Sequence, residues 1–321
     1  MAGERIDRYY GIKPQIADEL KSYETLYFRE DKPVPFCGLL LYPATLHDYE
    51  GFLNCVSCLT LNKNEDPKGI RMSNIHYLIS KIQSKEEGSE WSYKIQHLFE
   101  IIFHIKNGIK CTGCNTVYGY GSPEFAKMIS DADKESRESG NKPKLKCPSC
   151  GASEDTNFTQ MIKIVQDSQS KQYSFVVDGH TIGRDEFNRL RYIVMYQNFS
   201  DYQDDAYVDP EIKKDHDAHM ELLMKQNDSH ATLEKKVVAM SIATHYSFAE
   251  LFDMTIRKFN MVLTTVDDKI DYECMKQGLM SGMVTLKKGE KPEHWIYKKE
   301  KDLYGDAYKD KDALEQEVST L

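Results

Sequence analysis

The chain has 321 residues, of which 40% are hydrophobic and 29% charged, and its formal net charge is −9. This length and apolar content predict two or three folded modules rather than a disordered chain. The acidic balance argues against a protein whose main surface binds nucleic acid, because phosphate contacts require a clustered basic face. The first residues do not resemble a signal peptide, and no apolar run approaches the roughly 18 residues that span a bilayer. We therefore expect a soluble, intracellular protein that makes no membrane contact.

The first third of the sequence predicts an N-terminal arm, residues 1–32, followed by a mainly helical module, residues 33–107. Apolar residues recur at helical offsets through most of the module, and Asn107-Gly108 marks its end. We expect one strand at Pro33–Leu41 and three helices, at His47–Leu61, Ser73–Ile82 and Ser89–Ile105.

Two Cys-x-x-Cys pairs give the strongest local signal in the chain. They are Cys111-Thr-Gly-Cys114 and Cys147-Pro-Ser-Cys150, and each has the form of one knuckle of a zinc ribbon. Four thiolates at this spacing favour tetrahedral Zn²⁺ and leave no open position for a substrate. In a reducing cytosol, paired cysteines are also more often metal ligands than disulfides. Residues 108–158 are therefore predicted to form a zinc ribbon with a structural Zn²⁺; ordinary surface thiols are the alternative.

The two pairs are separated by a long insert, residues 115–146. Its first residues read as the strand that leaves the first knuckle. Ser122-Pro123-Glu124 then supplies an N-cap, a proline at the first helical position and an early acid, so a helix is expected to about Lys134. The polar stretch Glu135–Lys144 is predicted to be a solvated loop.

A third pair, Cys55-Val-Ser-Cys58, has no glycine or proline between its cysteines and lies in an apolar helical pattern. Buried core thiols are the favoured interpretation. The alternatives are a second metal site that combines Cys55 and Cys58 with Cys37 and His47 or His76, and a redox pair, which the lack of a βαβ pattern disfavours. Cys274 is expected to be a packed side chain.

After the ribbon, residues 159–200 predict a small antiparallel sheet followed by a helix. Phe158–Gln166 and Gln172–Val177 read as strands, and Asp178-Gly179 is a strong turn signal. Helical spacing returns at Asp185–Gln197.

The last third, residues 201–296, is predicted to be a helical module that ends in a charged tail, residues 297–321. The methionines at 275, 280 and 283 could form an adaptable partner surface, although methionines more often fill cores. The helices are expected at Asp209–Met224, at Leu233–Thr244, and from a capping box at Ser247 through Leu263.

No catalytic motif stands out in the sequence. There is no glycine-rich phosphate loop, no nucleophile elbow and no His-Glu-x-x-His. His216 and His219 could bind a metal with Asp215, but a charged helical face carries such histidines without a task. We therefore expect that the protein is not an enzyme, and keep a hidden site at His216 and His219 as an alternative.

Several mostly apolar stretches carry a resemblance to a known family: Pro33-Val-Pro-Phe-Cys-Gly-Leu-Leu-Leu-Tyr-Pro43, Asp48-Tyr49 with Phe52, Leu59-Thr-Leu-Asn-Lys63 with Met72, and, near the other end, Phe248–Phe259, Ser281-Gly282-Met283 and His294-Trp295. In these residues the chain resembles tail-assembly and baseplate proteins of large tailed, myovirus-like phages. The resemblance implies a non-enzymatic, structural role in the virion tail, or in the host cytoplasm during assembly. Its partners would then be other tail or baseplate proteins, in a symmetric multi-copy assembly.

Together these observations predict an α+β fold, a mainly helical multi-module chain with a central four-cysteine zinc ribbon and a small antiparallel sheet. The leading functional hypothesis is a structural or assembly component of a phage tail or baseplate. The alternative is an intracellular zinc-ribbon protein that contacts nucleic acid or the transcription machinery. Lys142, Lys144 and Lys146 could touch a phosphate backbone in that case, although a solvated loop is the commoner explanation.

Overall fold

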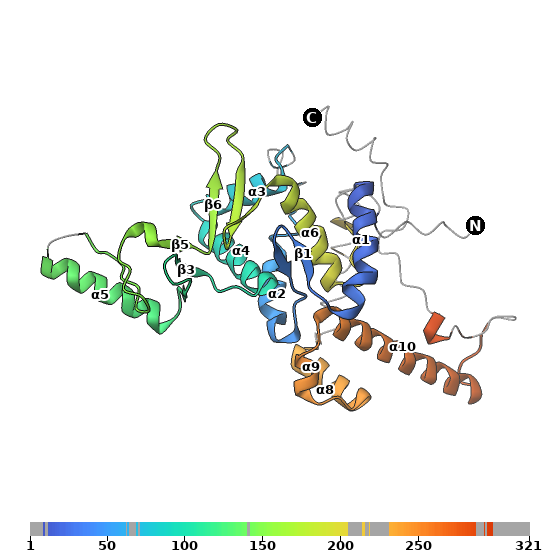
Figure 1. Ribbon diagram of the computed structural model, residues 1–321. Helices are drawn as coiled ribbons and strands as arrows, with labels where there is room; N and C mark the ends of the chain where they lie inside the picture. Colours follow the sequence, from blue (N-terminus) through green and yellow to red (C-terminus); the bar gives the residue numbers. More distant parts are fainter. Residues whose placement is uncertain are drawn as a thin grey trace. The chain divides into compact units, whose positions relative to one another are not determined.

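The computed structural model describes residues 9, 12–61, 63, 69, 71–139, 142–204, 214–215, 218, 231–286, 292 and 294–297. Two compact units share the chain: unit 1 comprises Met1–Asp31, Pro43–Tyr49 and Met195–Leu321, and unit 2 comprises Lys32–Tyr42 and Glu50–Val194. Helices, small antiparallel sheets and a four-cysteine cluster confirm the predicted α+β class (Figure 1). Among the described residues, no helix is both long and apolar enough to cross a membrane. The finer division into six segments stays a prediction.

Unit 2 contains all of the described sheets. Its helices are α2 (Tyr49–Val56), α3 (Asn74–Ile82), α4 (Gly88–Phe103), α5 (Pro123–Ser139), the short η3 (Asp155–Asn157) and most of α6 (Arg184–Asn198). Its strands are β1 (Val34–Phe36), β2 (Leu39–Leu41), β3 (Gly108–Cys111), β4 (Val117–Gly119), β5 (Phe158–Gln160), β6 (Ile162–Gln166), β7 (Tyr173–Val177) and β8 (His180–Ile182). They form a β1-β2 hairpin and two three-stranded antiparallel sheets, β4-β3-β5 and β6-β7-β8.

Aromatic side chains build the core of unit 2 where helices meet the β6-β7-β8 sheet. Phe99 of α4, Phe175 of β7 and Phe187 of α6 are fully buried. The Phe99 and Phe175 ring centroids lie 5.2 Å apart in an edge-to-face arrangement, and those of Phe175 and Phe187 lie 5.6 Å apart. Such pairs add about 0.5–1.5 kcal/mol beyond the area that they bury. The helices predicted at Ser73–Ile82, Ser89–Ile105 and Asp185–Gln197 are confirmed as α3, α4 and α6, and the aromatic pairs join α4 and α6 to the sheet.

Two predicted elements of the N-terminal module were wrong in extent. Pro33–Leu41 is a hairpin rather than one strand, with Val34 paired to Leu41. Its turn residues Cys37 and Gly38 have positive φ angles of 48° and 80°, as tight hairpin turns require. The predicted helix at His47–Leu61 begins as η2 (Leu46–Asp48) and continues as α2 only to Val56.

The predicted strand Phe158–Gln166 is also divided, at Met161. The Met161 N–H donates to the Gly108 carbonyl oxygen (2.9 Å), whereas the Met161 carbonyl oxygen accepts from the Asp178 N–H (2.8 Å). One residue therefore serves two different strand partners, so β5 pairs with β3 and β6 pairs with β7. The predicted turn at Asp178-Gly179 is confirmed, because both residues have positive φ angles between β7 and β8.

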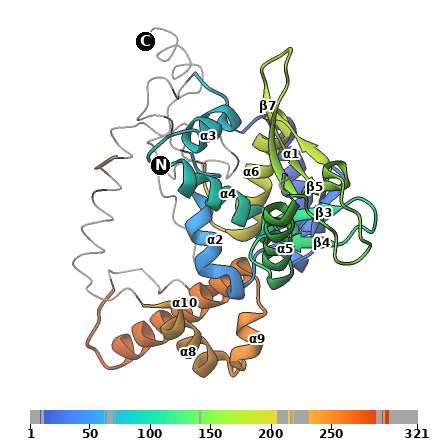
Figure 2. The same cartoon turned by 90° about the vertical axis from the view of Figure 1, so that its left-hand side faces the viewer.

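Unit 1 is helical in the part of it that the structure describes. Its elements are α1 (Pro14–Leu26), η1 (Phe28–Glu30), η2, α8 (Leu233–Thr244), α9 (Phe248–Phe252), α10 (Ile256–Met280) and η4 (Trp295–Tyr297). Helices α8, α9 and α10 lie side by side (Figure 2). Their shared core consists of Leu46, Val237, Met240, Leu251 and Phe259.

The capping box predicted at Ser247 is confirmed, but the helix that follows it ends earlier than expected. Ser247 Oγ accepts from the Glu250 N–H, and the Glu250 carboxylate accepts from the Ser247 N–H. Helix α9 ends at Phe252 because Thr255 begins a new helix, with its hydroxyl oxygen accepting from the Lys258 N–H. Helix α8 matches the predicted bounds. The helix expected at Asp209–Met224 and the tail 297–321 lie almost entirely outside the described residues.

Candidate metal centre

The two Cys-x-x-Cys pairs fold into two loops of the same form. In the first loop, the Asn115 N–H donates to the Cys111 carbonyl oxygen (2.8 Å), and the Cys111 N–H donates to the Thr116 carbonyl oxygen (2.9 Å). In the second loop, Gly151 donates to Cys147 (2.8 Å), and Cys147 donates to Ala152 (2.8 Å), through the corresponding backbone groups. Each loop therefore turns the chain back on itself directly after its second cysteine.

The residue after the second cysteine makes this turn possible in both loops. Asn115 has a φ of 59° and Gly151 a φ of 78°. Both lie in the left-handed region, which asparagine and glycine tolerate best. The turn does not come from the residues between the cysteines, because neither Gly113 nor Ser149 has a positive φ. In the sequence, the asparagine after the first pair and the glycine after the second pair are the residues that indicate these turns.

The loops bring the four sulfur atoms into one cluster. The Sγ atoms of Cys111, Cys114, Cys147 and Cys150 all lie within 4.8 Å of one another. The Cys111–Cys150 and Cys114–Cys147 separations are each 3.6 Å. A tetrahedral ion with metal–sulfur bonds of about 2.3 Å requires sulfur–sulfur separations of about 3.8 Å. The donor set and its spacing therefore fit a metal ion such as zinc.

Hydroxyl groups lie beside two of the four sulfur atoms and favour the ionised form of these two thiols. The buried Tyr118 Oη lies 3.1 Å from Cys147 Sγ, and Thr116 Oγ1 lies 3.2 Å from Cys114 Sγ. Burial raises the pKa of Cys147, but hydrogen bonds from Tyr118 and from the N–H groups of Cys150 and Ser149 lower it to about 6. The Thr116 hydroxyl likewise lowers the pKa of Cys114. The Ala152 N–H lowers the pKa of Cys150, but the hydrogen bond with Cys147, burial and the other two sulfur atoms raise it to about 12. Metal binding requires thiolates, so the contacts at Cys147 and Cys114 favour a cation at the site, whereas Cys150 must lose its proton when the ion binds.

The Tyr118 contact was not anticipated from the sequence. Tyr118 lies on β4, where its side chain is buried within the ribbon, and it also contacts Ser149 Oγ at 2.8 Å. It therefore joins the strand after the first knuckle to the second knuckle. This role is that of a residue beside the ligands that orients and tunes them.

The insert between the knuckles packs on the ribbon through its helix. The predicted N-cap is confirmed, because Ser122 Oγ accepts from the Phe125 N–H at 3.2 Å. Helix α5 runs to Ser139, five residues beyond the expected end at Lys134, and Met128 on it is buried with the ribbon core. Its buried residues are few: Ile109, Cys111, Tyr118, Met128 and Cys147. Two of these five are cysteines of the sulfur cluster, so the buried apolar core of the ribbon is small.

The third cysteine pair does not form a second metal site among the described residues, where the ribbon cysteines are the group with ligand geometry. Cys55 and Cys58 are buried, as the favoured interpretation held. Burial raises the pKa of Cys55 to about 11, and burial followed by the nearby Cys55 sulfur raises the pKa of Cys58 to about 12. Cys37 lies in the β1-β2 turn instead. The expectation for Cys274 was wrong, because this side chain is exposed on α10.

Thiol alkylation at pH 8 is expected to separate these classes. Cys274 should react first because it is exposed, whereas Cys55 and Cys58 should stay unmodified, since burial keeps them protonated and covered. Adding a chelator should expose the ribbon cysteines and leave Cys55 and Cys58 unchanged. The measurement is peptide mass spectrometry after timed iodoacetamide treatment. Chelator-dependent labelling of Cys55 and Cys58 would contradict it.

The remaining candidate site residues lie elsewhere. His216 and His219 are outside the described residues, so the alternative metal site at these histidines stays a prediction. Lys142, Lys144 and Lys146 are exposed beside the second knuckle, as expected for a solvated segment.

Comparison with known proteins links one region of the chain to phages. The model of a family described as YomV second domain matches residues 225–300. This is a phage-related domain, and the match suggests a phage origin without identifying a tail or baseplate family. No curated protein and no solved structure matches the chain significantly.

Proposed function

We propose that this protein is a structural or assembly component of a phage tail or baseplate, that it acts through protein–protein contacts rather than catalysis, and that the ribbon cysteines hold a structural Zn²⁺. The observation that carries this proposal is the match of residues 225–300 to a phage-related domain. The four-sulfur cluster supports a structural role for this ion, because four thiolates would fill a tetrahedral coordination shell and leave no position for a substrate.

The surface of the matched region supports a role in protein contacts. Helix α8 buries Val237 and Met240 on one face and exposes Val238 and Ile242 on the opposite face, with Ile242 72% exposed. A helix that is apolar on both faces is typical of a segment buried from two sides. At the end of α10, Met280 and Met283 are 86% and 87% exposed. Exposed apolar side chains of this kind mark protein interaction sites, and methionine adapts readily to a partner surface.

Native mass spectrometry of purified particles, with metal analysis, tests the proposal. We expect the chain to be found in the tail or baseplate fraction in multiple copies, with about one zinc ion per copy. Ile242→Glu should reduce incorporation, because it places a charge in the proposed contact, whereas Ala243→Glu, also exposed on α8, should not. A chain that is absent from particles and turns over a substrate would refute the proposal.

The alternative class is an intracellular zinc-ribbon protein that contacts nucleic acid or the transcription machinery. The observation in its favour is the exposed run of Lys142, Lys144 and Lys146 next to the second knuckle. The formal charge of −9 weighs against it. Nucleic-acid binding that weakens with added salt and is lost when the three lysines are replaced would favour this alternative over the tail role.

A further inference from the structure

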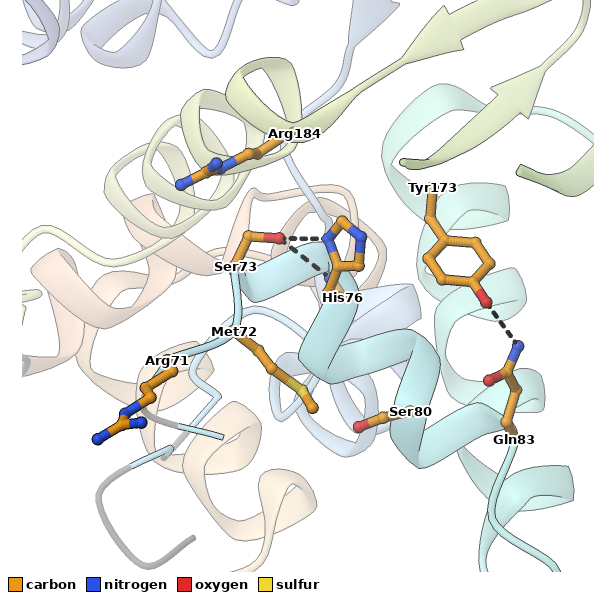
Figure 3. A pocket seen from close by; sticks show the side chains of 8 residues that line it. All are labelled: Arg71, Met72, Ser73, His76, Ser80, Gln83, Tyr173 and Arg184. Carbon is orange, nitrogen blue, oxygen red and sulfur yellow. Dashed lines mark hydrogen bonds between the residues drawn. The ribbon is translucent and has the colours of Figure 1, made fainter. Parts of the chain in front are cut away.

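A pocket in unit 2 lies apart from the metal centre and carries a concentration of positive charge. It has a volume of about 490 Å³ and is lined by eight side chains that lie along α3 and just before and after it, on β7 and at the start of α6 (Figure 3). None of the eight is acidic. The net charge of the chain is −9, whereas the charged side chains that line this pocket are both positive.

Two arginines enter this pocket from distant parts of the sequence. Arg71 precedes α3 and Arg184 begins α6, and both side chains are exposed. In Figure 3 Arg184 lies above Ser73 and Arg71 below it, and both guanidinium groups point away from Tyr173. Within the described part of the chain, neither guanidinium has an ion pair or a hydrogen bond to a protein group, so both are available to a ligand. Asp185 and Glu186 follow Arg184 on α6 but do not line the pocket.

A lysine extends the positive region at the pocket wall. Lys63 Nζ donates to the carbonyl oxygen of Met72, a lining residue, at 2.9 Å. Burial lowers the pKa of Lys63, and the positive charges of Arg191 and Arg184 lower it further. Mutual repulsion among these cations is a cost that an anion in the pocket would offset.

Helix α3 adds polar donors to the same place. Ser73 is the N-cap of this nine-residue helix and lines the pocket, so the positive end of the helix dipole faces it. The Ser73 hydroxyl contacts His76 Nδ1 at 2.7 Å, and the His76 ring packs against the edge of Tyr173 with centroids 5.3 Å apart. The wall opposite the arginines thus offers an aromatic surface.

Together these features select a class of ligand. Guanidinium groups recognise phosphate through paired, charge-assisted hydrogen bonds, and a helix N-terminus favours the same anion. Pockets of about 300–1,000 Å³ hold small organic ligands rather than single ions. We propose that this pocket binds the phosphate group of a small phosphorylated molecule of nucleotide size, with Arg71 and Arg184 as its anchors. The site is independent of the assembly role and of the zinc ribbon.

Calorimetric titration of the whole 321-residue chain tests the site with four probes: inorganic phosphate, ribose 5-phosphate, ADP and adenosine. ADP and ribose 5-phosphate are expected to bind and adenosine is not, because the phosphate supplies the contacts. Tighter binding of ADP than of ribose 5-phosphate would assign the base to the aromatic wall formed by His76 and Tyr173. Equal affinities for ADP and ribose 5-phosphate would show that the phosphate group alone is recognised. Either result supports the site.

Substitutions locate the binding. Arg71→Ala and Arg184→Ala should each raise the Kd of ADP about tenfold or more, because each removes charge-assisted hydrogen bonds. Arg184→Lys should recover part of the loss. Arg137→Ala removes an exposed arginine of α5 outside the pocket and should leave the Kd unchanged. Thermal unfolding of each variant separates lost binding from lost folding.

Three results would overturn the proposal. They are no heat with ADP at millimolar concentration, the same Kd for ADP in wild type and in a folded Arg184→Ala variant, and adenosine binding as tightly as ADP. Binding of a single-stranded oligonucleotide without any binding of ADP or ribose 5-phosphate would also overturn it, in favour of a nucleic-acid contact.

Discussion

Cys147→Ser is expected to abolish tight zinc binding and to unfold the ribbon, the largest effect that we predict for a single substitution. Cys147 is a buried member of the small ribbon core, contacts Tyr118 and supplies one of the four sulfur atoms of the candidate metal site. Structural zinc contributes on the order of 10 kcal/mol of apparent binding energy to the folding of small modules. Without that energy, a core of five buried residues does not hold β3, β4 and β5 together.

The measurements are zinc content by elemental analysis and hydrogen exchange across residues 108–161. Zinc should fall from about one ion per chain to well below half, and amide protection should be lost in the ribbon while the aromatic core around Phe99 and Phe175 keeps it. Cys274→Ser is the matched control, because this exposed thiol on α10 contributes to no metal group in the described chain. Full zinc content and unchanged exchange in Cys147→Ser would show that the sulfur cluster is not a metal site.

The parts of the site that the sequence predicted are those determined by neighbouring residues. The spacing within each cysteine pair, the N-cap at Ser122 and the capping box at Ser247 all act over three or four positions. A local pattern is enough in such cases, because the interacting groups are close in the chain whatever the rest of the fold does. The prediction of the turn at Asp178-Gly179 was correct for the same reason.

Features that depend on distant partners were missed. The contact of Tyr118 with Cys147 arises only after the insert has brought the second knuckle back to β4. The pocket combines Arg71 and Arg184, which have nothing in common as sequence patterns. The division of Phe158–Gln166 at Met161 is a choice between two partner strands, and strand propensity contains no information on that choice. In each case tertiary structure decided what local periodicity could not.

Arg257→Ala is expected to destabilise unit 1 by about 3–5 kcal/mol, because it removes a buried cation from a network of fixed partners. Arg257 is 5% exposed at the start of α10. Its Nη1 donates to the Tyr196 carbonyl oxygen (2.6 Å) and its Nη2 to Glu24 Oε1 (3.1 Å). The guanidinium also lies over the Phe28 ring, 5.9 Å from its centroid. One side chain thus joins α10 to α1, η1 and the end of α6 within unit 1.

The loss of folding free energy in Arg257→Ala should exceed that of an exposed ion pair, because the substitution takes the guanidinium away from two acceptors that are largely buried. Without Arg257, the carboxylate of Glu24, whose side chain is only 25% exposed, loses the guanidinium and keeps the hydrogen bond from the Tyr9 hydroxyl. The buried Tyr196 carbonyl oxygen loses this donor as well. Arg257→Met restores most of the packing volume but leaves both groups without the guanidinium, so its cost should be nearly as large. Glu24→Gln should cost less, since the guanidinium keeps its bond to Tyr196.

Chemical denaturation followed by circular dichroism measures these differences, with Lys258→Ala as the neighbouring control. Lys258 Nζ lies 3.8 Å from Asp31, and its side chain is 57% exposed, so its removal should cost at most about 1 kcal/mol. A loss of about 3–5 kcal/mol in Arg257→Ala would lower Tm by about 6–20 °C in a domain of this size. Equal free energies of unfolding for Arg257→Ala and Lys258→Ala would show that the guanidinium does not hold α10, α1, η1 and the end of α6 together. Apolar packing around Val237, Leu251 and Phe259 must then stabilise unit 1 instead.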